Sequence, residues 1–525
     1  MRRISIREGN TGILDITAPD GERKRYVPDC DLRESNRLLQ QFYTLRSSDG
    51  KAIKDCYWKD GINWFPTTTA LLHWHVLYMY VKYRAFMHEY PTDKYEYVFL
   101  NRRRLADFVS LLLSQEKDIQ RSTIGLIKRS TNRVKCFLAH MHNRIVFRIC
   151  PGITVLFMRY GSTDFRTRHA KEVLAELGVK CVEIGKLGIL ELVRSITREN
   201  ARPKLLSCRK TSCKKCVPIE FPQTSDYILD RVLRTAVFAI ENKIHAFQET
   251  YEFLKETLRT SPIQKMYGID DTNNFYPAIY ACRENGIKTI GHQHGTNFKT
   301  VWEPAYQLKG FIAGEYQWFD EVLVWGKYWQ DHIISKLCCF TKEQIKVGTY
   351  LRPVSRPARL NLCGDVGTRN VLVPYEFYAD TYTIGRYIVA LQDLGYTVYF
   401  KWREDEKLED ELAAYCLPED REKDIVVVSQ ITDDVMAKIN IVAATCSLVI
   451  FDVFPYMKET WILESKFVFG DYLVQEGIAK RIRLDHVEED IQQTVKGINQ
   501  DLVDYVLSSK SLKEVLQKTL LGAEV

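Results

Sequence analysis

Short runs of apolar residues alternate with amphipathic stretches from residue 153 onward, and a glycine often stands where one stretch ends. The run ITVLFMRY at 153–160 predicts a buried strand, and residues 167–177 predict a helix that Gly178 ends. The sequence VKCVEI then begins a second strand, which completes the βαβ unit of a parallel sheet. A long amphipathic helix is expected over 225–260, with Ser225 as its N-cap.

The same alternation continues to residue 350. Further strands are expected at residues 263–271, 287–295, 321–326 and 344–348, and a helix at 274–285 that Gly286 ends. Strands and helices that alternate at this spacing predict a doubly wound α/β domain over residues 151–350.

Residues 351–369 (LRPVSRPARLNLCGDVGTR) contain prolines, glycines and no apolar period, so they are expected to form a linker. A second α/β domain is expected over 370–485, with strands at 370–376, 397–405, 425–429, 440–444 and 466–470 and a helix at 380–394. Residues 486–525 are expected to form C-terminal helices. The fold class is therefore expected to be α/β, with two Rossmann-type doubly wound domains facing a cleft, and with ligands at the carboxyl ends of the strands.

The first 150 residues have a less regular pattern and are expected to form an additional helical or α/β region, with a strand at 95–100 and a helix at 105–113. The most apolar stretch, 69–86, is interrupted by His73, His75, Lys82 and Arg84, so it predicts a buried or interfacial helix and no transmembrane span. The first residues lead into no apolar segment of the kind that a secretory signal has.

The composition is that of a folded protein: 46% of the 525 residues are hydrophobic and 27% are charged. The net charge of +7 is uneven, because Arg102, Arg103 and Arg104 are consecutive and more cations lie within 117–135. A solvated helix face explains these charges, and so does a docking surface for an anionic membrane or a lipid-linked acceptor. No nucleic-acid-binding module accompanies them, so a nucleic acid partner is not expected.

The chain has 14 cysteines and no secretory signal, which indicates reduced thiols and a cytoplasmic protein, with peripheral attachment to the inner face of a membrane as an option. Cys208, Cys213 and Cys216 include a C-x-x-C pair that is typical of zinc sites. A structural zinc site needs four ligands, and no second pair lies nearby in the sequence, so free thiols and no metal are expected.

Polar residues follow a predicted strand of the first domain as His292, Gln293, His294 and Gly295. A histidine at the carboxyl end of a strand can act as a general base, and a glycine lets a ligand approach the backbone closely. The alternative is that a histidine here is a satisfied structural group in a turn; because two of them flank a glutamine, we favour a catalytic role for His292 and His294, with Gln293 and Gly295 on the acceptor side.

Two other strand ends of the first domain carry candidates. Asp270 and Asp271 can deprotonate an acceptor hydroxyl, although an Asx-type helix cap explains them equally well. Arg159, Tyr160 and Ser162 end the first strand of the domain and are candidates for acceptor contacts.

In the second domain, Lys401 and Arg403 close a strand where the phosphates of a nucleotide are expected, and Arg offers a bidentate fork to phosphate. Thr445 and Ser447 stand at a strand-to-helix junction, where amides and hydroxyls can bind phosphate; a plain N-cap role for Thr445 is the alternative.

Two carboxylates complete the donor-side candidates. Glu376 and Glu464 can bind ribose hydroxyls, and surface salt bridges explain them equally well. No P-loop, dinucleotide fingerprint, H-E-x-x-H or G-x-S-x-G motif occurs, which argues against P-loop ATPases, the usual NAD enzymes, zinc proteases and α/β-hydrolases.

Three stretches together carry a resemblance to a known family: 270–296, with GIKTIGHQHGT at its end; 320–350, with DEVLVWGKYW and EQIKVGTY; and 444–479, with ATCSLVIF and TWILES. They resemble GT-B glycosyltransferase-like proteins of bacterial capsule and lipopolysaccharide biosynthesis, and the likeness covers residues 153–480. It implies a metal-independent transferase without a cofactor, with a nucleotide-sugar donor in the second domain and a glycan or lipid-linked acceptor in the first.

The resemblance also bears on individual residues. Related sialyl- and Kdo-transferases have an acidic pair, which Asp270 and Asp271 match, and a Ser-Ser/Thr motif, which Thr445 and Ser447 roughly match. Their His-Pro motif is absent here, and Trp402 and Arg403 stand in its place. The alternatives are a CDP-glycerol-type polyol-phosphate transferase, a sugar-nucleotide epimerase, and a non-catalytic scaffold of a polysaccharide assembly complex.

Overall fold

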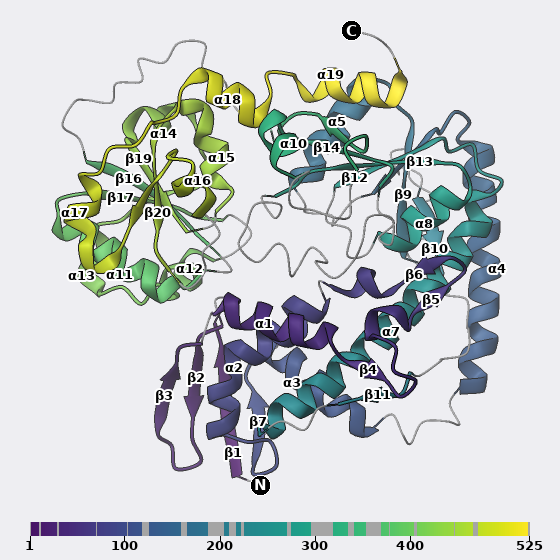
Figure 1. Cartoon of the computed structure of the whole chain (residues 1–525), viewed down its shortest axis with the longest axis horizontal. Helices are drawn as coiled ribbons and strands as arrows, with labels where there is room; N and C mark the ends of the chain where they lie inside the picture. Colours follow the sequence, from purple (N-terminus) through teal and green to yellow (C-terminus); the bar gives the residue numbers. More distant parts are fainter. Residues whose placement is uncertain are drawn as a thin grey trace.

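The computed structural model describes most of the chain in three parts that lie around a common centre (Figure 1). The described residues are 2–9, 12–28, 31–69, 71–101, 103–117, 125–158, 165–186, 204–208, 217–221, 225–269, 275–295, 319–333, 341–352, 369–376, 379–403, 407–445, 447–465 and 471–522. The N-terminal part carries its own small sheet, and each of the other two parts is built on a larger parallel sheet.

The first large sheet has seven strands among the described residues, in the order β10-β9-β8-β12-β13-β14-β15, and every neighbouring pair is parallel. The strands are β8 (Val155–Met158), β9 (Cys181–Lys186), β10 (Lys204–Ser207), β12 (Lys265–Ile269), β13 (Lys288–His292), β14 (Glu321–Val324) and β15 (Ile345–Val347). The chain moves outward from β8 to β10, returns to the other side of β8, and continues outward to β15. The winding therefore reverses between β8 and β12, as in a Rossmann-type sheet.

The second large sheet repeats this plan with six described strands in the order β18-β17-β16-β19-β20-β21, all parallel. They are β16 (Asn370–Pro374), β17 (Thr397–Lys401), β18 (Val426–Val428), β19 (Ile441–Ala444), β20 (Glu459–Leu463) and β21 (Lys480–Ile482). The winding reverses between β16 and β19. The prediction of an α/β protein with two Rossmann-type domains is confirmed.

Helices connect these strands and cover the sheets. In the first domain they are α5 (Phe165–Glu176), α7 (Tyr227–Leu258), α8 (Tyr276–Glu284) and α10 (Lys327–Ile333). In the second they are α11 (Thr381–Asp393), α12 (Leu408–Ala413), α13 (Glu419–Lys423), α14 (Asp433–Lys438), α15 (Val449–Val453), η6 (Phe454–Tyr456) and α16 (Asp471–Gln475).

The side chain of Asp226 caps α7, so the expectation that Ser225 is the N-cap is wrong.

The N-terminal part contains more strands than the sequence predicted. Its sheet has the order β3-β2-β1-β7, with β1 (Arg2–Glu8) parallel to β7 (Tyr95–Phe99), and with β2 (Leu14–Thr17) and β3 (Arg23–Tyr26) antiparallel beside it. Its shorter elements are β4 (Arg46–Ser47), η1 (Ile53–Asp55), β5 (Trp58–Lys59), β6 (Ile62–Asn63) and η2 (Phe65–Thr68), and β4 pairs with β11 (Ile219–Glu220). Its helices are α1 (Leu32–Tyr43), η3 (Leu71–Leu77), α2 (Tyr78–Glu89), α3 (Arg104–Lys117) and α4 (Gly125–Ile149).

The apolar stretch around residues 69–86 forms η3 and α2, and His73 and Lys82 are buried within it. Of the two predicted alternatives, a buried or an interfacial helix, the structure has the buried one. Among the described residues, every helix is too short or too polar to traverse a lipid bilayer.

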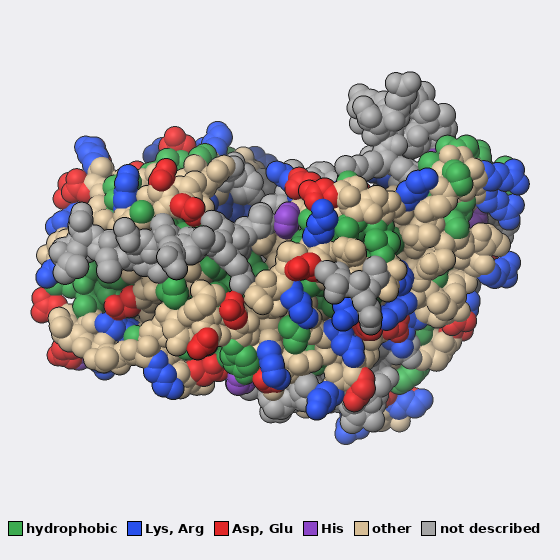
Figure 2. All heavy atoms as spheres, turned by 90° about the horizontal axis from the view of Figure 1, so that it is seen from above, with side chains coloured by type: hydrophobic (Ala, Val, Ile, Leu, Met, Phe, Trp, Pro, Cys, Tyr) green, Lys and Arg blue, Asp and Glu red, His purple; other side chains and the backbone are tan. Residues whose placement is uncertain are grey.

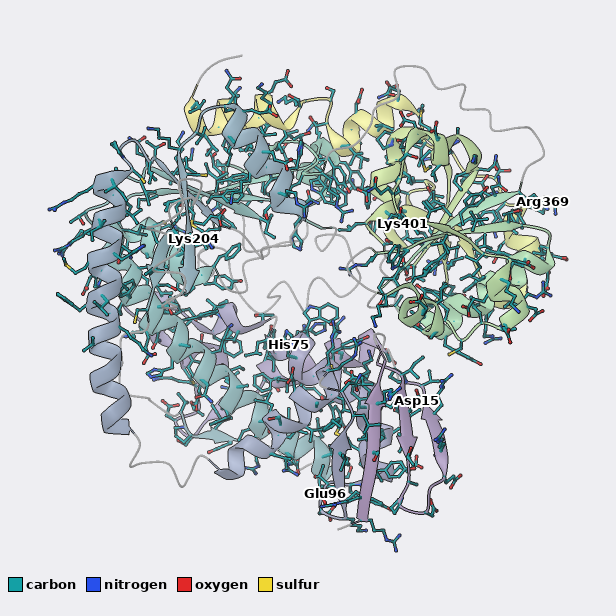
Figure 3. The ribbon with its side chains drawn as sticks, turned by 180° about the vertical axis from the view of Figure 1, so that it is seen from behind. Asp15, His75, Glu96, Lys204, Arg369 and Lys401 are labelled. Atoms are coloured by element: carbon teal, nitrogen blue, oxygen red, sulfur yellow. The ribbon has the colours of Figure 1, made fainter. Side chains whose placement is uncertain are left out.

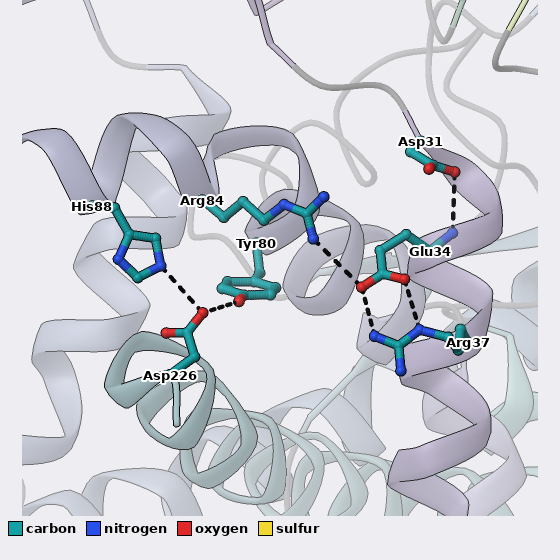
Figure 4. Close-up of polar contacts among 7 residues, drawn as sticks. All are labelled: Asp31, Glu34, Arg37, Tyr80, Arg84, His88 and Asp226. Atoms are coloured by element: carbon teal, nitrogen blue, oxygen red, sulfur yellow. Dashed lines mark hydrogen bonds and ion pairs between the residues drawn. The ribbon is translucent and has the colours of Figure 1, made fainter. Parts of the chain in front are cut away.

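Polar contacts at the start of α7 join the N-terminal part to the first domain (Figure 4). The Asp226 carboxylate accepts hydrogen bonds from the amides of Ile228 and Leu229 as the helix cap. It also accepts the Tyr80 hydroxyl at 2.5 Å, and its Oδ2 lies 3.1 Å from Nε2 of His88. One side chain thus caps a helix of the first domain and holds two residues of α2.

An aromatic contact continues this junction into the core. The buried Trp64 ring packs edge-on against Tyr251 of α7, with centroids 5.5 Å apart, and against Tyr280 of α8, at 5.2 Å. Because these rings are buried together, the N-terminal part and the first domain share one hydrophobic core.

A buried aromatic seam, formed by Trp325, Trp329 and Phe451, joins the two Rossmann-type domains. The Phe451 ring lies 5.5 Å from each of the two tryptophan rings. Beside it, Arg352 donates to Asp452 at 2.5 Å in a half-buried ion pair. Both contacts connect the first domain to α15, so they fix one sheet relative to the other.

The C-terminal segment crosses from the second domain back to the first (Figure 1). It forms η7 (Leu484–His486), α17 (Val487–Ile491), α18 (Gln500–Leu507), α19 (Leu512–Leu516) and η8 (Gln517–Leu521). The indole of Trp329 donates to the carbonyl of Val506 at 2.9 Å, and Lys265 of β12 donates to the carbonyls of Thr519 and Leu520. These bonds satisfy backbone groups at helix ends that otherwise need water.

We predict that His73 makes the protein sensitive to acid. Burial lowers the pKa of His73 from 6.5 to about 3, so the folded chain keeps it neutral while the unfolded chain takes up a proton below pH 6.5. Stability is therefore lost as the pH falls from about 6.5 toward 3, at roughly 1.4 kcal/mol per pH unit for this site.

The thermal unfolding midpoint of His73→Leu, measured between pH 7 and pH 5, should fall less steeply than that of the unmodified protein. Equal slopes for the two proteins would show that His73 does not contribute to the acid sensitivity.

Candidate functional site

The carboxyl edge of the second sheet turns toward the rest of the molecule. Arg369, directly before β16, lies on the outer side of the domain, and Lys401, the last residue of β17, lies on the inner side (Figure 3). The strands run parallel, so their carboxyl ends share the inner side with Lys401. The candidate donor residues Glu376, Arg403, Thr445 and Glu464 all follow strands of this sheet and so belong to this edge.

Glu376 lies at the point where the winding of the second sheet reverses, and it holds the turn after β19. Its carboxylate accepts the amide of Ser447 at 2.7 Å and the amide of Thr445 at 3.0 Å, and it also accepts the Thr445 hydroxyl. Its own amide donates to the Tyr415 hydroxyl at 3.2 Å. Glu376 is buried with only 3% exposed, so these bonds lie in a region of low dielectric, where they are strong.

Three residues that sequence reasoning selected separately therefore meet in space. The amides of Thr445 and Ser447, which the sequence assigned to donor phosphates, are bound to the Glu376 carboxylate. The amides of this turn bind a carboxylate of the same domain, in the way that such amides bind a phosphate. Glu376 is buried, which contradicts the alternative of a salt bridge on the surface.

Two basic residues of this edge lie at the end of β17 and directly after it, namely Lys401 and Arg403. Lys401 pairs in register with Pro374 of β16, which places it beside the strand that leads to Glu376. Its ammonium donates to the carbonyl of Trp402 at 2.5 Å, and the side chain is half-buried, whereas Arg403 is exposed. Two cations thus lie at the end of β17, the strand beside β16, and α/β domains of this kind bind ligands at the switch point next to β16.

The opposite side of the edge carries an ionic group that sequence reasoning found only in part. Glu464 follows β20 and lies 3.7 Å from Arg481, and Arg481 also donates to Asp471 at 2.7 Å. The sequence pointed to Glu464 but to neither partner. The strand β21, which carries Arg481, is only three residues long, and its pattern alone does not separate it from a loop.

In the first domain, the assignment of a catalytic role to His292 is wrong. The side chain is fully buried at the end of β13, its Nδ1 lies 2.8 Å from the Tyr267 hydroxyl, and its Nε2 lies 2.8 Å from the carbonyl of Thr349. A carbonyl only accepts, so Nε2 carries the proton and Nδ1 accepts from tyrosine. His292 is a structural residue that joins β12, β13 and the segment after β15.

Gln293 is also structural, and its expected acceptor contact is wrong. Its side-chain oxygen accepts the amide of Trp325 at 3.0 Å, its backbone carbonyl accepts the Trp325 indole at 2.6 Å, and its amide group donates to the carbonyl of Gly295 at 2.9 Å. Gln293 and Gly295 are buried, and the acceptor contact expected of Gly295 stays a prediction. The bonds hold the turn that carries His294.

His294 is the remaining candidate of this motif. It is half-buried, between two buried residues, on a turn that Trp325 fixes from the neighbouring strand. A half-exposed imidazole on a fixed turn at the carboxyl edge of the sheet is suited to proton transfer, because its position changes little when a substrate arrives.

The other first-domain candidates lie outside the described residues, namely Arg159, Tyr160, Ser162, Asp270 and Asp271, as do Cys213, Cys216, most of the linker 351–369 and the strand expected at 466–470. Cys208 is described, and its Sγ lies 2.9 Å from that of Cys136. Within the described parts of the chain, no group of three His, Cys, Asp or Glu side chains is arranged to hold a metal ion.

Comparisons with known proteins give distant similarity in structure only. No family model matches the sequence, and no curated protein matches it. Among solved structures, Acinetobacter baumannii MurG aligns with 69% of this chain and 97% of its own length at 12% identity and a TM-score of 0.36.

Two further structures align in the same way. The S. aureus MnaA–UDP structure covers 70% of this chain and 97% of its own at 10% identity, with a TM-score of 0.40. The UDP-GlcNAc 2-epimerase from Neisseria meningitidis bound to UDP-GlcNAc covers 70% and 99% at 9% identity, with a TM-score of 0.38. The strand orders of the two sheets, and not these alignments, establish the fold.

The Glu376 cluster leads to a prediction about stability. Glu376→Gln replaces one acceptor oxygen with an NH₂ group that faces N–H and O–H donors, and we expect a loss of about 2 kcal/mol, the usual value for a hydrogen bond to a buried charge. The thermal unfolding midpoint measures the effect.

Glu464→Gln is the matched control, because it makes the same change at the same edge of the sheet on an exposed side chain. We expect less than about 0.5 kcal/mol there. Equal losses in the two variants would contradict the assigned role of Glu376.

Proposed function

We propose that this protein is a glycosyltransferase that moves a sugar from a nucleotide-activated donor to a surface polysaccharide or to a lipid-linked acceptor. The observation that carries the proposal is that Lys401 and Arg403, at the end of β17, share the carboxyl edge of the second sheet with the Glu376–Thr445–Ser447 turn at its switch point. A nucleotide needs cations for its phosphates and a fixed turn beside them, and this edge offers both.

On the donor side, Lys401 and Arg403 bind the phosphates and stabilise the negative charge on the departing nucleotide. Glu376 acts as a positioning residue, since its carboxylate orients the turn that places Thr445 and Ser447 next to the donor. Glu464 binds a ribose hydroxyl from the other side of the edge. The nucleotide sugar is a substrate, so the proposed reaction needs no resident cofactor.

On the acceptor side, His294 takes the proton from the acceptor hydroxyl as its oxygen attacks the sugar carbon that bears the nucleotide. Asp270 and Asp271 stay candidates for the same task, and Arg159, Tyr160 and Ser162 for acceptor contacts. The fixed turn of His294 supports its choice as the base.

A non-catalytic nucleotide-binding scaffold is the second candidate function. Two observations favour it. The side chain of His292 is buried, and Trp402 and Arg403 stand where related transferases have the His-Pro motif. A scaffold would bind the nucleotide without cleaving the donor.

The donor site is tested by thermal unfolding of the purified chain with CMP, CDP, UDP, GDP and dTDP. A ligand that binds only the folded state at a concentration of about 100 times its Kd stabilises it by about 2.7 kcal/mol, so one nucleotide should raise the midpoint clearly. Arg403→Ala should abolish that rise. Arg369→Ala should keep it, because Arg369 lies at the opposite edge of the same sheet (Figure 3).

Catalysis is tested by hydrolysis of sugar donors that carry the nucleotide identified in that screen. His294→Ala should lower the rate by about 100-fold or more, with nucleotide binding unchanged, as for loss of a general base. If the unmodified chain binds a nucleotide but does not hydrolyse the sugar donor, the result supports the non-catalytic scaffold. If the chain binds none of the nucleotides, both the transferase and the scaffold are rejected.

A further inference from the structure

The helix α4 presents a continuous apolar stripe to solvent along the outer side of the molecule. It stands at the edge of the structure, away from the second domain (Figures 1 and 3). The exposed apolar side chains on its described part are Val134, Phe137, Leu138, Met141, Ile145 and Ile149. Phe137 is 64% exposed and Ile149 63%, which is unusual for large apolar side chains in one cluster.

The spacing of these residues places them on one face of the helix. Val134, Leu138, Met141, Ile145 and Ile149 are separated by three or four positions, which is the repeat of a helical stripe. The surface cluster therefore extends along the described part of the helix, from Val134 to Ile149.

The opposite face of α4 is fixed to the first domain, so the stripe cannot turn inward. The Asn143 side chain donates to the carbonyl of Leu206 at 3.0 Å and accepts the amide of Leu206 at 2.8 Å, pairing with the edge strand β10. Ala139 and Val146 are buried on the same side.

The charge of the helix is of one sign. Its sequence contains six Lys and Arg residues and no Asp or Glu, and no acidic residue occurs between Asp118 and Asp164. Lys135, Arg144 and Arg148 are exposed beside the apolar stripe. Figure 2 shows Lys and Arg side chains together with hydrophobic ones at this end of the molecule.

We propose that this face of α4 binds the surface of an anionic lipid bilayer, with the helix lying parallel to the membrane plane. A helix with an apolar stripe and flanking cations is suited to this position, since the stripe enters the boundary between headgroups and acyl chains while the cations bind the headgroups. A second copy of the chain fits less well, because two such helices would bring Lys135, Arg144 and Arg148 of each copy close to those of the other. The inference goes beyond the proposed function and does not depend on it.

The test is flotation of the full chain with vesicles of phosphatidylcholine alone and with vesicles that also contain 30% phosphatidylglycerol. The chain should float only with the anionic vesicles, and 0.5 M NaCl should reduce the bound fraction. The double substitution Arg144→Glu and Arg148→Glu should weaken binding by about tenfold or more, because each basic residue near such a surface contributes about fivefold.

Ile145→Ser with Ile149→Ser should weaken binding as well, which separates insertion of the stripe from charge attraction alone. The matched control is Lys407→Glu with Lys423→Glu, the same charge change on exposed residues of the second domain, and it should float like the unmodified chain. Unfolding midpoints confirm that all variants are folded.

Several outcomes overturn the proposal. It is wrong if the chain stays at the bottom of the gradient with anionic vesicles, if the chain floats equally with neutral vesicles, or if the control weakens binding as much as the α4 variants do. If light scattering instead detects a dimer that the α4 substitutions dissociate, the face is an interface between copies of the chain.

Discussion

The structure depends on the buried aromatic seam between the two Rossmann-type domains. Trp325 and Trp329 of the first domain contact Phe451 of the second, and the half-buried ion pair of Arg352 with Asp452 lies beside them. Aromatic rings of this size bury large apolar areas, and the half-buried ion pair holds its partners 2.5 Å apart, so together they set one relative position of the two sheets. The C-terminal helices strengthen the same junction, since Trp329 also donates to Val506 of α18.

The same tryptophan cluster connects packing to the site. Trp325 donates two hydrogen bonds to Gln293, and these hold the turn that exposes His294. A residue whose ring forms the seam between domains therefore also orients the proposed base. On the second sheet, Glu376 has the corresponding role, because its carboxylate fixes the turn of Thr445 and Ser447. Each candidate site thus rests on a buried polar contact at the carboxyl edge of its sheet.

The local pattern of apolar and polar residues predicts most of the strands and helices of the two Rossmann-type domains. The strands expected near 263–271, 321–326, 370–376 and 440–444 are β12, β14, β16 and β19, and the helix expected at 380–394 is α11. The strands β1, β2 and β3 are not predicted because their pattern is mixed. The sequence places a strand at 466–470, after β20, and β21 is only three residues long. The N-cap of α7 is Asp226 and not Ser225, because the Asp226 carboxylate accepts the amides of Ile228 and Leu229.

The sequence by itself determined the alternation of strands and helices, the positions where strands end, and the residue types at those ends, because each depends on neighbours along the chain. Only the tertiary structure decided which of those ends face outward. His292 and His294 are two residues apart, yet His292 is enclosed between Tyr267 and the carbonyl of Thr349, and His294 is not fully buried. Burial depends on contacts between segments distant in sequence, and those contacts also joined Glu376 to Thr445 and left the apolar face of α4 in solvent.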